Sequence, residues 1–159
     1  MDDEFKIYID QLRNGHDSTI DENLSPAFLD IHEQDLAFEK NVKLDGKAYL
    51  ADQELILHWD VQTEALVACS ICNEKVPVEI HVKNFYYAEP VSEIKTAIFN
   101  FKDLLRSTIL IEVPKFIECN EGNCPKRQDF KKYLKGKPAS QLNVNEDEGY
   151  QPFADLDLK

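Results

Sequence analysis

Alternating apolar and polar positions dominate the first two thirds of this chain. Such runs are rich in β-branched and aromatic residues here, which is typical of half-buried strands. They cover residues 5–12, 54–62, 64–70 and 76–88. The Asp45-Gly46 pair predicts a tight hairpin turn, because glycine readily adopts the positive φ that such a turn requires. The pattern therefore predicts an antiparallel meander of four to six strands.

Two segments depart from this alternation. Residues 13–26 are polar and rich in turn-forming residues, so they predict a loop, followed by a short helical turn with Ser25 as its N-cap and Pro26 in its first position. Residues 100–113 change to a helical period, with Asn100 as a cap and a proline directly after the segment. One face of this helix would carry Phe101, Leu104, Leu105 and Thr108.

Composition narrows the class of protein. Hydrophobic residues make up 43% and charged residues 30% of the 159-residue chain, as in ordinary soluble domains. The first residues are acidic and do not form a secretory signal, and no apolar run reaches the roughly 18 residues of a membrane span. We therefore expect a cytoplasmic protein, in which paired cysteines indicate metal binding or catalysis before structural disulfides.

Charge is distributed unevenly along the chain. The formal net charge is −12, and residues 1–60 contain 15 acidic and 5 basic residues, a net charge of −10. Residues 126–137 contain 6 basic residues and 1 acidic residue, a net charge of +5. The basic segment could attract nucleic acid locally, and the acidic half would suit a basic protein partner. Both runs are also compatible with ordinary solvated surfaces.

Four cysteines form two closely spaced pairs. Cys69 and Cys72 are separated by two residues, and Cys119 and Cys124 by four, both of which are spacings found in zinc sites. The 46 residues between the pairs exceed the usual spacing of a finger or ribbon. A single structural Zn²⁺ site with four thiolate ligands is the favoured hypothesis. The alternatives are four free thiols, or a redox pair at Cys69, where no helix is predicted to lower the thiol pKa.

Other candidate sites are weaker. We recognise no phosphate-binding glycine loop, nucleophile elbow or catalytic carboxylate pair, so we expect a protein that is not an enzyme. His58 and His81 lie in strand-like runs and are expected to be packed or surface residues. The aromatic run from Phe85 to Tyr87 could stack on bases, but its position favours a core cluster at a strand end.

These features together predict an α+β fold. We expect an antiparallel meander or barrel-like sheet, one main helix and a zinc-ribbon-like cysteine element, all in one domain of residues 1–137. Residues 138–159 are polar and acidic and predict a flexible tail. The tail contains one short apolar motif, which would dock on a partner or on the domain itself, unless it is simply part of a disordered end. Its residues are Tyr150, Phe153 and Leu156.

The order of these motifs resembles the YceD family, the large ribosomal RNA subunit accumulation proteins. Members carry a strand ending in Cys-x-x-Cys, an alternating strand, a helix closing on proline, a second cysteine cluster and a final Asn-Pro-Phe-x-x-Leu element. The resemblance covers residues 40–159. This chain differs at Ser70-Ile71, where members often carry arginine, and at Gln151, where asparagine is usual.

The resemblance implies a role in the synthesis, processing or accumulation of large-subunit (23S) ribosomal RNA, without a known enzymatic reaction. The means of contact would be the basic residues after the second cysteine pair, held in a fixed array by zinc and meeting phosphates. These residues are Lys126, Arg127, Lys131, Lys132, Lys135 and Lys137. The alternative function is an acidic zinc-binding adaptor whose N-terminal half holds a basic client such as a ribosomal protein.

Overall fold

The chain forms two compact units, Met1–Cys124 and Pro125–Lys159. A computed structural model describes residues 3–129, and the predicted domain end at residue 137 and the predicted tail lie outside them. The elements are η1 (Asp3–Phe5), β1 (Lys6–Tyr8), α1 (Ile9–Leu12), β2 (Ser18–Leu24), η2 (Pro26–Leu29), β3 (Leu36–Ala37), β4 (Val42–Ala51), β5 (Glu54–Ala68), β6 (Lys75–Pro90), η3 (Val91–Glu93), β7 (Ile98–Asn100), α2 (Lys102–Glu112) and α3 (Cys119–Gly122).

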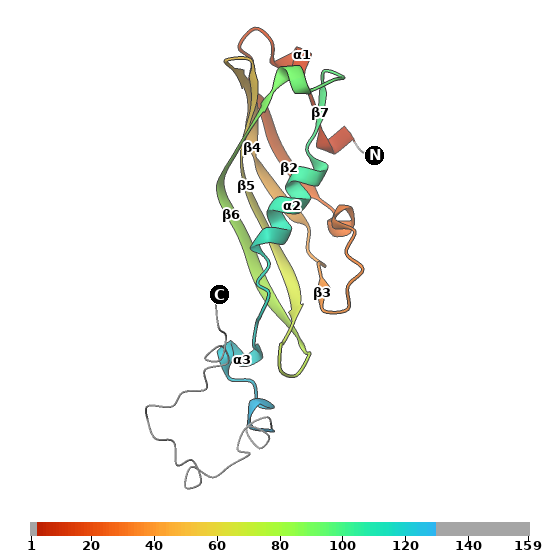
Figure 1. Cartoon of the computed structure of the whole chain (residues 1–159), viewed down its shortest axis with the longest axis vertical. Helices are drawn as coiled ribbons and strands as arrows, with labels where there is room; N and C mark the ends of the chain where they lie inside the picture. Colours follow the sequence, from red (N-terminus) through yellow and green to blue (C-terminus); the bar gives the residue numbers. More distant parts are fainter. Residues whose placement is uncertain (1–2, 130–159) are drawn as a thin grey trace, which may run out of the picture. The chain divides into compact units, whose positions relative to one another are not determined.

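The larger sheet is an antiparallel meander, as the sequence predicts. β2 pairs with β4, β4 with β5, and β5 with β6, while the short β3 pairs with the last part of β5 (Figure 1). β1 and β7 form a separate two-stranded antiparallel sheet. Antiparallel sheets with few helices confirm the α+β class. Neither sheet closes on itself among the described residues, so the structure does not support the expected barrel-like closure.

The predicted turn at Asp45-Gly46 is wrong. Both residues lie inside β4, where Gly46 is the direct partner of Trp59 on β5. The hairpin turn between β4 and β5 falls instead at Asp52 and Gln53, which both have positive φ, 48° and 67°. Two consecutive positive φ angles are typical of a type I′ turn, whose twist matches that of the flanking strands.

The N-terminal elements also differ from the pattern. The expected strand over residues 5–12 is limited to β1, and α1 follows it directly. The loop expected over residues 13–26 contains β2, which the sequence conceals because only Ile20 and Leu24 of this strand are buried. The helical turn after it is confirmed as η2, in which the amide of Ala27 donates a hydrogen bond to the N-cap oxygen Ser25 Oγ at 3.4 Å.

The core lies on one face of the larger sheet. Alternate residues of β5 are buried there, and α2 covers them with the face that its period predicts (Figure 1). Phe101, Leu105, Thr108 and Ile109 are buried, and Leu104 packs partly against the same cluster. The structure places the N-cap at Phe101, one residue later than predicted, but Asn100 Oδ1 still caps the first amide of α2 by accepting a hydrogen bond from Lys102 N at 2.9 Å.

Aromatic side chains join the sheet to the segment before α2. Trp59 stacks on Phe85 with ring centroids 5.1 Å apart and meets Phe101 at 5.5 Å. Phe101 also contacts Phe5 at 5.8 Å. Each such pair contributes about 0.5–1.5 kcal/mol beyond the burial of its area. The start of α2 is therefore anchored by packing as well as by its cap.

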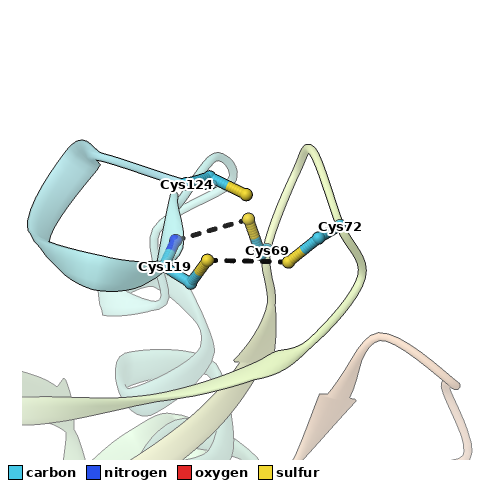
Figure 2. Close-up of side chains that lie close together, drawn as sticks. All are labelled: Cys69, Cys72, Cys119 and Cys124. Atoms are coloured by element: carbon cyan, nitrogen blue, oxygen red, sulfur yellow. Dashed lines mark hydrogen bonds between the residues drawn. The ribbon is translucent and has the colours of Figure 1, made fainter. Parts of the chain in front are cut away.

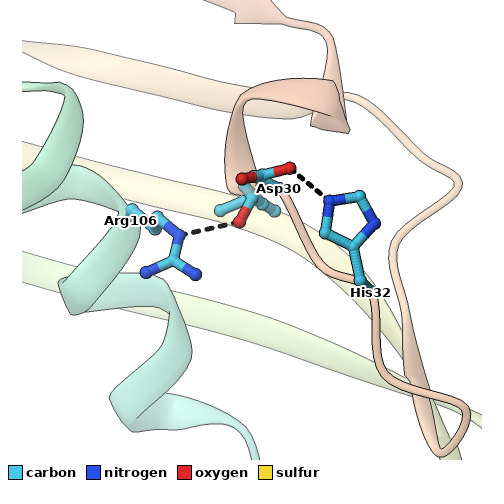
Figure 3. A network of polar contacts seen from close by, with 4 residues as sticks. Asp30, His32 and Arg106 are labelled. Carbon is cyan, nitrogen blue, oxygen red and sulfur yellow. Dashed lines mark hydrogen bonds and ion pairs between the residues drawn. The ribbon is translucent and has the colours of Figure 1, made fainter.

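A polar contact fixes the middle of α2 against η2. The Nε of Arg106 donates a hydrogen bond to the carbonyl oxygen of Leu29 at 2.7 Å (Figure 3). Beside it, Asp30 has a left-handed conformation that ends η2, and its carboxylate contacts His32 Nε2 at 2.6 Å. The start and the middle of α2 are thus held, and the chain leaves the helix at Val113 toward the second cysteine pair.

Candidate metal centre

The first cysteine pair occupies the tip of the β5–β6 hairpin. Cys69 N donates to the carbonyl oxygen of Glu74 at 2.7 Å, and Asn73 N donates to that of Cys69 at 2.9 Å. Asn73 has a φ of 63°, which asparagine tolerates better than most residues. This tight loop turns the chain so that the side chains of Cys69 and Cys72 face the same point (Figure 2).

The second pair lies in a compact turn around α3. Asn120, Glu121 and Gly122 all have positive φ, so α3 is a left-handed turn within a nominal helix. The amide of Cys124 donates to Glu118 Oε1 at 2.9 Å and closes the turn. The result brings Cys119 and Cys124 together although five peptide bonds separate them.

Two backbone amides donate hydrogen bonds from one of these segments to the other. Ser70 N donates to the carbonyl oxygen of Ile117 at 2.8 Å, and Cys119 N donates to Cys69 Sγ at 3.3 Å (Figure 2). Residues separated by 47 positions or more along the chain are thereby held side by side. Bringing such distant residues together costs chain entropy. Several contacts acting together are needed to offset that cost.

The four cysteine sulfurs form a single cluster. All four Sγ atoms lie within 4.8 Å of one another, and those of Cys72 and Cys119 are 3.5 Å apart. Ligands at about 2.3 Å from a central ion in tetrahedral geometry would be about 3.8 Å apart. A disulfide requires about 2.05 Å, and all four cysteines are free. The cluster therefore has dimensions suited to one metal ion.

Hydrogen bonds to sulfur favour a thiolate at Cys69. Burial raises the pKa of this thiol, but the amides of Cys72, Cys119 and Ile71 outweigh it and lower the pKa to about 6. In contrast, the hydrogen bond to Cys124 and burial raise the pKa of Cys119. A bound cation would favour deprotonation of the remaining thiols, because metal ions bind the thiolate form.

The donor set restricts what this site can do. Four thiolates suit soft and borderline ions such as zinc and iron, and they do not suit magnesium or calcium. With all four tetrahedral positions supplied by protein, no position is left for a substrate, as is usual in structural sites. The cluster can therefore hold chain segments together through a metal ion.

The structure brings the four predicted metal ligands together. This favours one shared site over four unrelated thiols, an alternative that the sequence left open. Lys126 and Arg127 lie in the second unit. The other residues of the predicted RNA-binding and partner-binding sets lie outside the described residues. They are Lys131, Lys132, Lys135, Lys137, Tyr150, Phe153 and Leu156.

Aromatic and histidine candidates divide between the two sheet faces. Phe85 packs on Trp59 and Tyr87 lies near Phe99, so both belong to the core side, as their position predicts. Tyr86 is 59% exposed and points to the other face. His58 and His81 also lie on that face and do not belong to the cysteine cluster.

Sequence reasoning missed the residues that support the ligands. Glu118 holds the second turn, and Ser70 and Ile117 join the two segments through their backbones. The position of Glu118 directly before Cys119 was the one available signal, since a carboxylate beside a tight turn often accepts backbone amides. The backbone contacts carry no side-chain signature.

Comparisons of the chain with protein-family models, with curated proteins and with solved structures find no match. Among the described residues, no helix is long and apolar enough to cross a membrane.

Proposed function

We propose that Cys69, Cys72, Cys119 and Cys124 hold one structural Zn²⁺ ion. The observation that carries this proposal is the single cluster of four sulfurs, drawn from two segments with 46 residues between them. Thiolates are the usual ligands of closed zinc sites, and such ions hold the chain without taking part in a reaction. The role of the metal is to fix the segment after α2 to the tip of the β5–β6 hairpin.

We infer that the protein acts without catalysis in the accumulation of large-subunit ribosomal RNA. The order of the motifs supports this, from the cysteine pair after β5 to Pro152-Phe153-x-x-Leu156, because it resembles the YceD family. The cysteine cluster adds support, since it unites the two cysteine motifs on which the resemblance depends.

The basic segment that begins at Lys126 is the proposed RNA contact. It follows Cys124 after a single residue, Pro125, so the metal centre and the cations are adjacent along the chain. Lysine and arginine bind phosphates of any sequence, and each neutralised phosphate releases counterions. Binding should therefore weaken steeply as the salt concentration rises.

Charge neutralisation tests the RNA contact. Six substitutions to glutamine in the segment 126–137 should abolish co-sedimentation with precursors of the large ribosomal subunit. A matched control removes the same charge from the first unit, at Lys40, Lys43, Lys47, Lys75, Lys83 and Lys95. The proposal is wrong if the control variant loses as much association as the segment variant.

A second candidate function is the binding of a basic protein client. The observation that favours it is a row of three carboxylates on adjacent strands, in which Asp45 is the direct partner of both Asp21 and Asp60. All three are exposed on the face opposite the core. Like charges directly opposite one another destabilise a sheet, and a cationic partner would relieve the repulsion.

The RNA-binding and client-binding functions predict opposite results for two variants, the glutamine variant of segment 126–137 and an asparagine variant of the carboxylate row. Replacing Asp21, Asp45 and Asp60 with asparagine should prevent capture of a ribosomal protein if the client function is right, and should leave RNA association unchanged. RNA binding could survive neutralisation of segment 126–137 while the asparagine variant loses client binding. That result would replace the RNA-binding proposal by the client-binding one.

A further inference from the structure

The four cysteines differ in their access to solvent. Cys69 is 0% and Cys124 3% exposed, whereas Cys72 and Cys119 are half-buried. The accessible two come from different motifs, and their sulfurs are 3.5 Å apart (Figure 2). A small reagent in solution therefore meets this pair first, and the pair spans the junction between the two segments.

We propose that Cys72 and Cys119 are an oxidation site, at which a peroxide forms a reversible disulfide between the two cysteine motifs. The proposal deepens the proposed metal centre and uses two of its ligands. The two sulfurs need to approach by about 1.5 Å to reach the disulfide bond length of about 2.05 Å. Cys72 lies in the loop between β5 and β6, and Cys119 is the first residue of α3, so a shift of this size requires no rearrangement of the sheet.

The reaction proceeds in two displacements. In zinc-loaded protein both thiols would be held in the thiolate form, and one of them attacks a peroxide oxygen, so that an S–O bond forms, the O–O bond breaks and hydroxide leaves. The second thiolate then attacks the sulfur of this sulfenic acid, so that the S–S bond forms and a second hydroxide leaves. Two protons from solvent convert both hydroxides to water. The cysteines lose two electrons, and hydrogen peroxide gains them.

Burial and hydrogen bonding select this pair over the pairs within each motif. Cys69 Sγ is enclosed and accepts amide hydrogen bonds from Ile71 and Cys119, which stabilise it where it lies. Cys124 is also enclosed, so neither sulfur meets the oxidant early. A sulfenic acid formed on Cys72 or Cys119 has the other accessible sulfur as its neighbour, which completes the disulfide before further oxidation.

Oxidation of Cys72 and Cys119 should also release the metal ion. A disulfide between Cys72 and Cys119 leaves two of four thiolates for the metal, so zinc should leave as the disulfide forms. The covalent bond would then replace the ion as the link between the β5–β6 hairpin and the segment after α2. The two motifs would stay joined in the oxidised, metal-free protein.

Peptide mapping of the full chain tests the proposal. Zinc-loaded protein is treated with increasing hydrogen peroxide, its thiols are blocked with N-ethylmaleimide, and it is digested with trypsin. Cleavage at lysine places Cys69 and Cys72 on one peptide, residues 48–75, and Cys119 and Cys124 on another, residues 116–126. The first oxidised product should be these two peptides cross-linked, with fragmentation assigning the bond to Cys72 and Cys119.

The outcomes separate this proposal from that of the zinc site. Cross-linked peptides that revert with dithiothreitol, and zinc released in equal amount, support it. A first product with the disulfide inside either peptide, or with sulfinic acid and no disulfide, overturns it. Zinc content is measured before oxidation on the same sample. Absence of zinc would refute the metal centre alone, while the mapping would still decide which cysteines pair.

Discussion

Gly46 on β4 is the direct cross-strand partner of Trp59 on β5, and the two backbones approach too closely for a side chain at Gly46. A Cβ added there would lie 2.5 Å from the Cβ of Trp59 and closer still to the carbonyl oxygen of His58. Real Cβ atoms do not approach other heavy atoms in this way, so the strands would have to separate. This glycine therefore permits the close packing of Trp59 in the core.

Replacing Gly46 with alanine should destabilise the fold by about 2 kcal/mol or more, because overpacking and strand displacement add together. Urea unfolding monitored by Trp59 fluorescence measures the effect. Gly15→Ala is the matched control, since a Cβ at Gly15 meets nothing within 4 Å and introduces strain only through its φ of 77°. Equal losses in the two variants would contradict the packing explanation.

The same glycine shows why the sequence mispredicts the hairpin. Asp-Gly is a strong turn signal when only local conformation is considered. Here the need for space opposite Trp59 is nonlocal, and the actual turn uses Asp52 and Gln53, a weaker pair. The buried face of α2 was predictable because the apolar residues that repeat with the helical period all lie within the segment itself.

The cap of α2 offers a more local test. Asn100→Ala removes the acceptor of the Lys102 amide at the first turn of the helix. The free energy of unfolding should fall by about 0.5–2 kcal/mol, the usual cost of losing such a cap. Asn23→Ala on the exposed face of β2 serves as the control. A loss no larger than that of the control would show that Phe101 packing alone holds this helix start.

Metal removal should loosen the junction and leave the sheet folded. Chelation of zinc-loaded protein is expected to speed hydrogen exchange at the amides of Ser70 and Cys119, which bond across the two segments. Amides between β4 and β5 should keep their protection, because the core of buried residues lies on the sheet and α2. Loss of protection throughout the first unit would show that the fold depends on the metal.

Tyr87 predicts a loss of stability at alkaline pH. Its hydroxyl donates to Glu89 Oε2 at 2.5 Å, and this bond and burial raise the pKa of Tyr87. The folded state then binds the proton more tightly than the unfolded state, whose tyrosine pKa is about 10. The stabilisation is fully present below that pH and is lost as pH rises through the folded pKa.

Tyr87→Phe should reduce this alkaline loss. The test compares the free energy of unfolding of wild type and variant across pH 9–12, where the difference between them should shrink as pH rises. Tyr86→Phe, on the exposed face of β6, is the matched control and should follow the wild type. If the difference in free energy of unfolding between wild type and Tyr87→Phe stays constant with pH, the alkaline loss does not arise from Tyr87.

The four cysteines of the candidate metal centre were predictable from spacing, and their arrangement was not. Cysteine pairs at two and four intervening residues carry the signal of a thiolate site. Their meeting depends on the β5–β6 hairpin, on the left-handed turn at Asn120 and on the backbone bond from Ser70 to Ile117. Those contacts involve backbone groups, which any residue possesses, so the sequence does not reveal them.

X-ray absorption at the zinc edge, on protein purified without chelators, tests the central claim most directly. One zinc per chain, with four sulfur neighbours at about 2.3 Å, is the result that the cysteine cluster predicts. Replacing Cys119 with serine should remove one sulfur from the shell or remove the ion. Zinc bound through nitrogen or oxygen ligands, or a zinc content unaffected by serine at all four cysteines, would contradict the account.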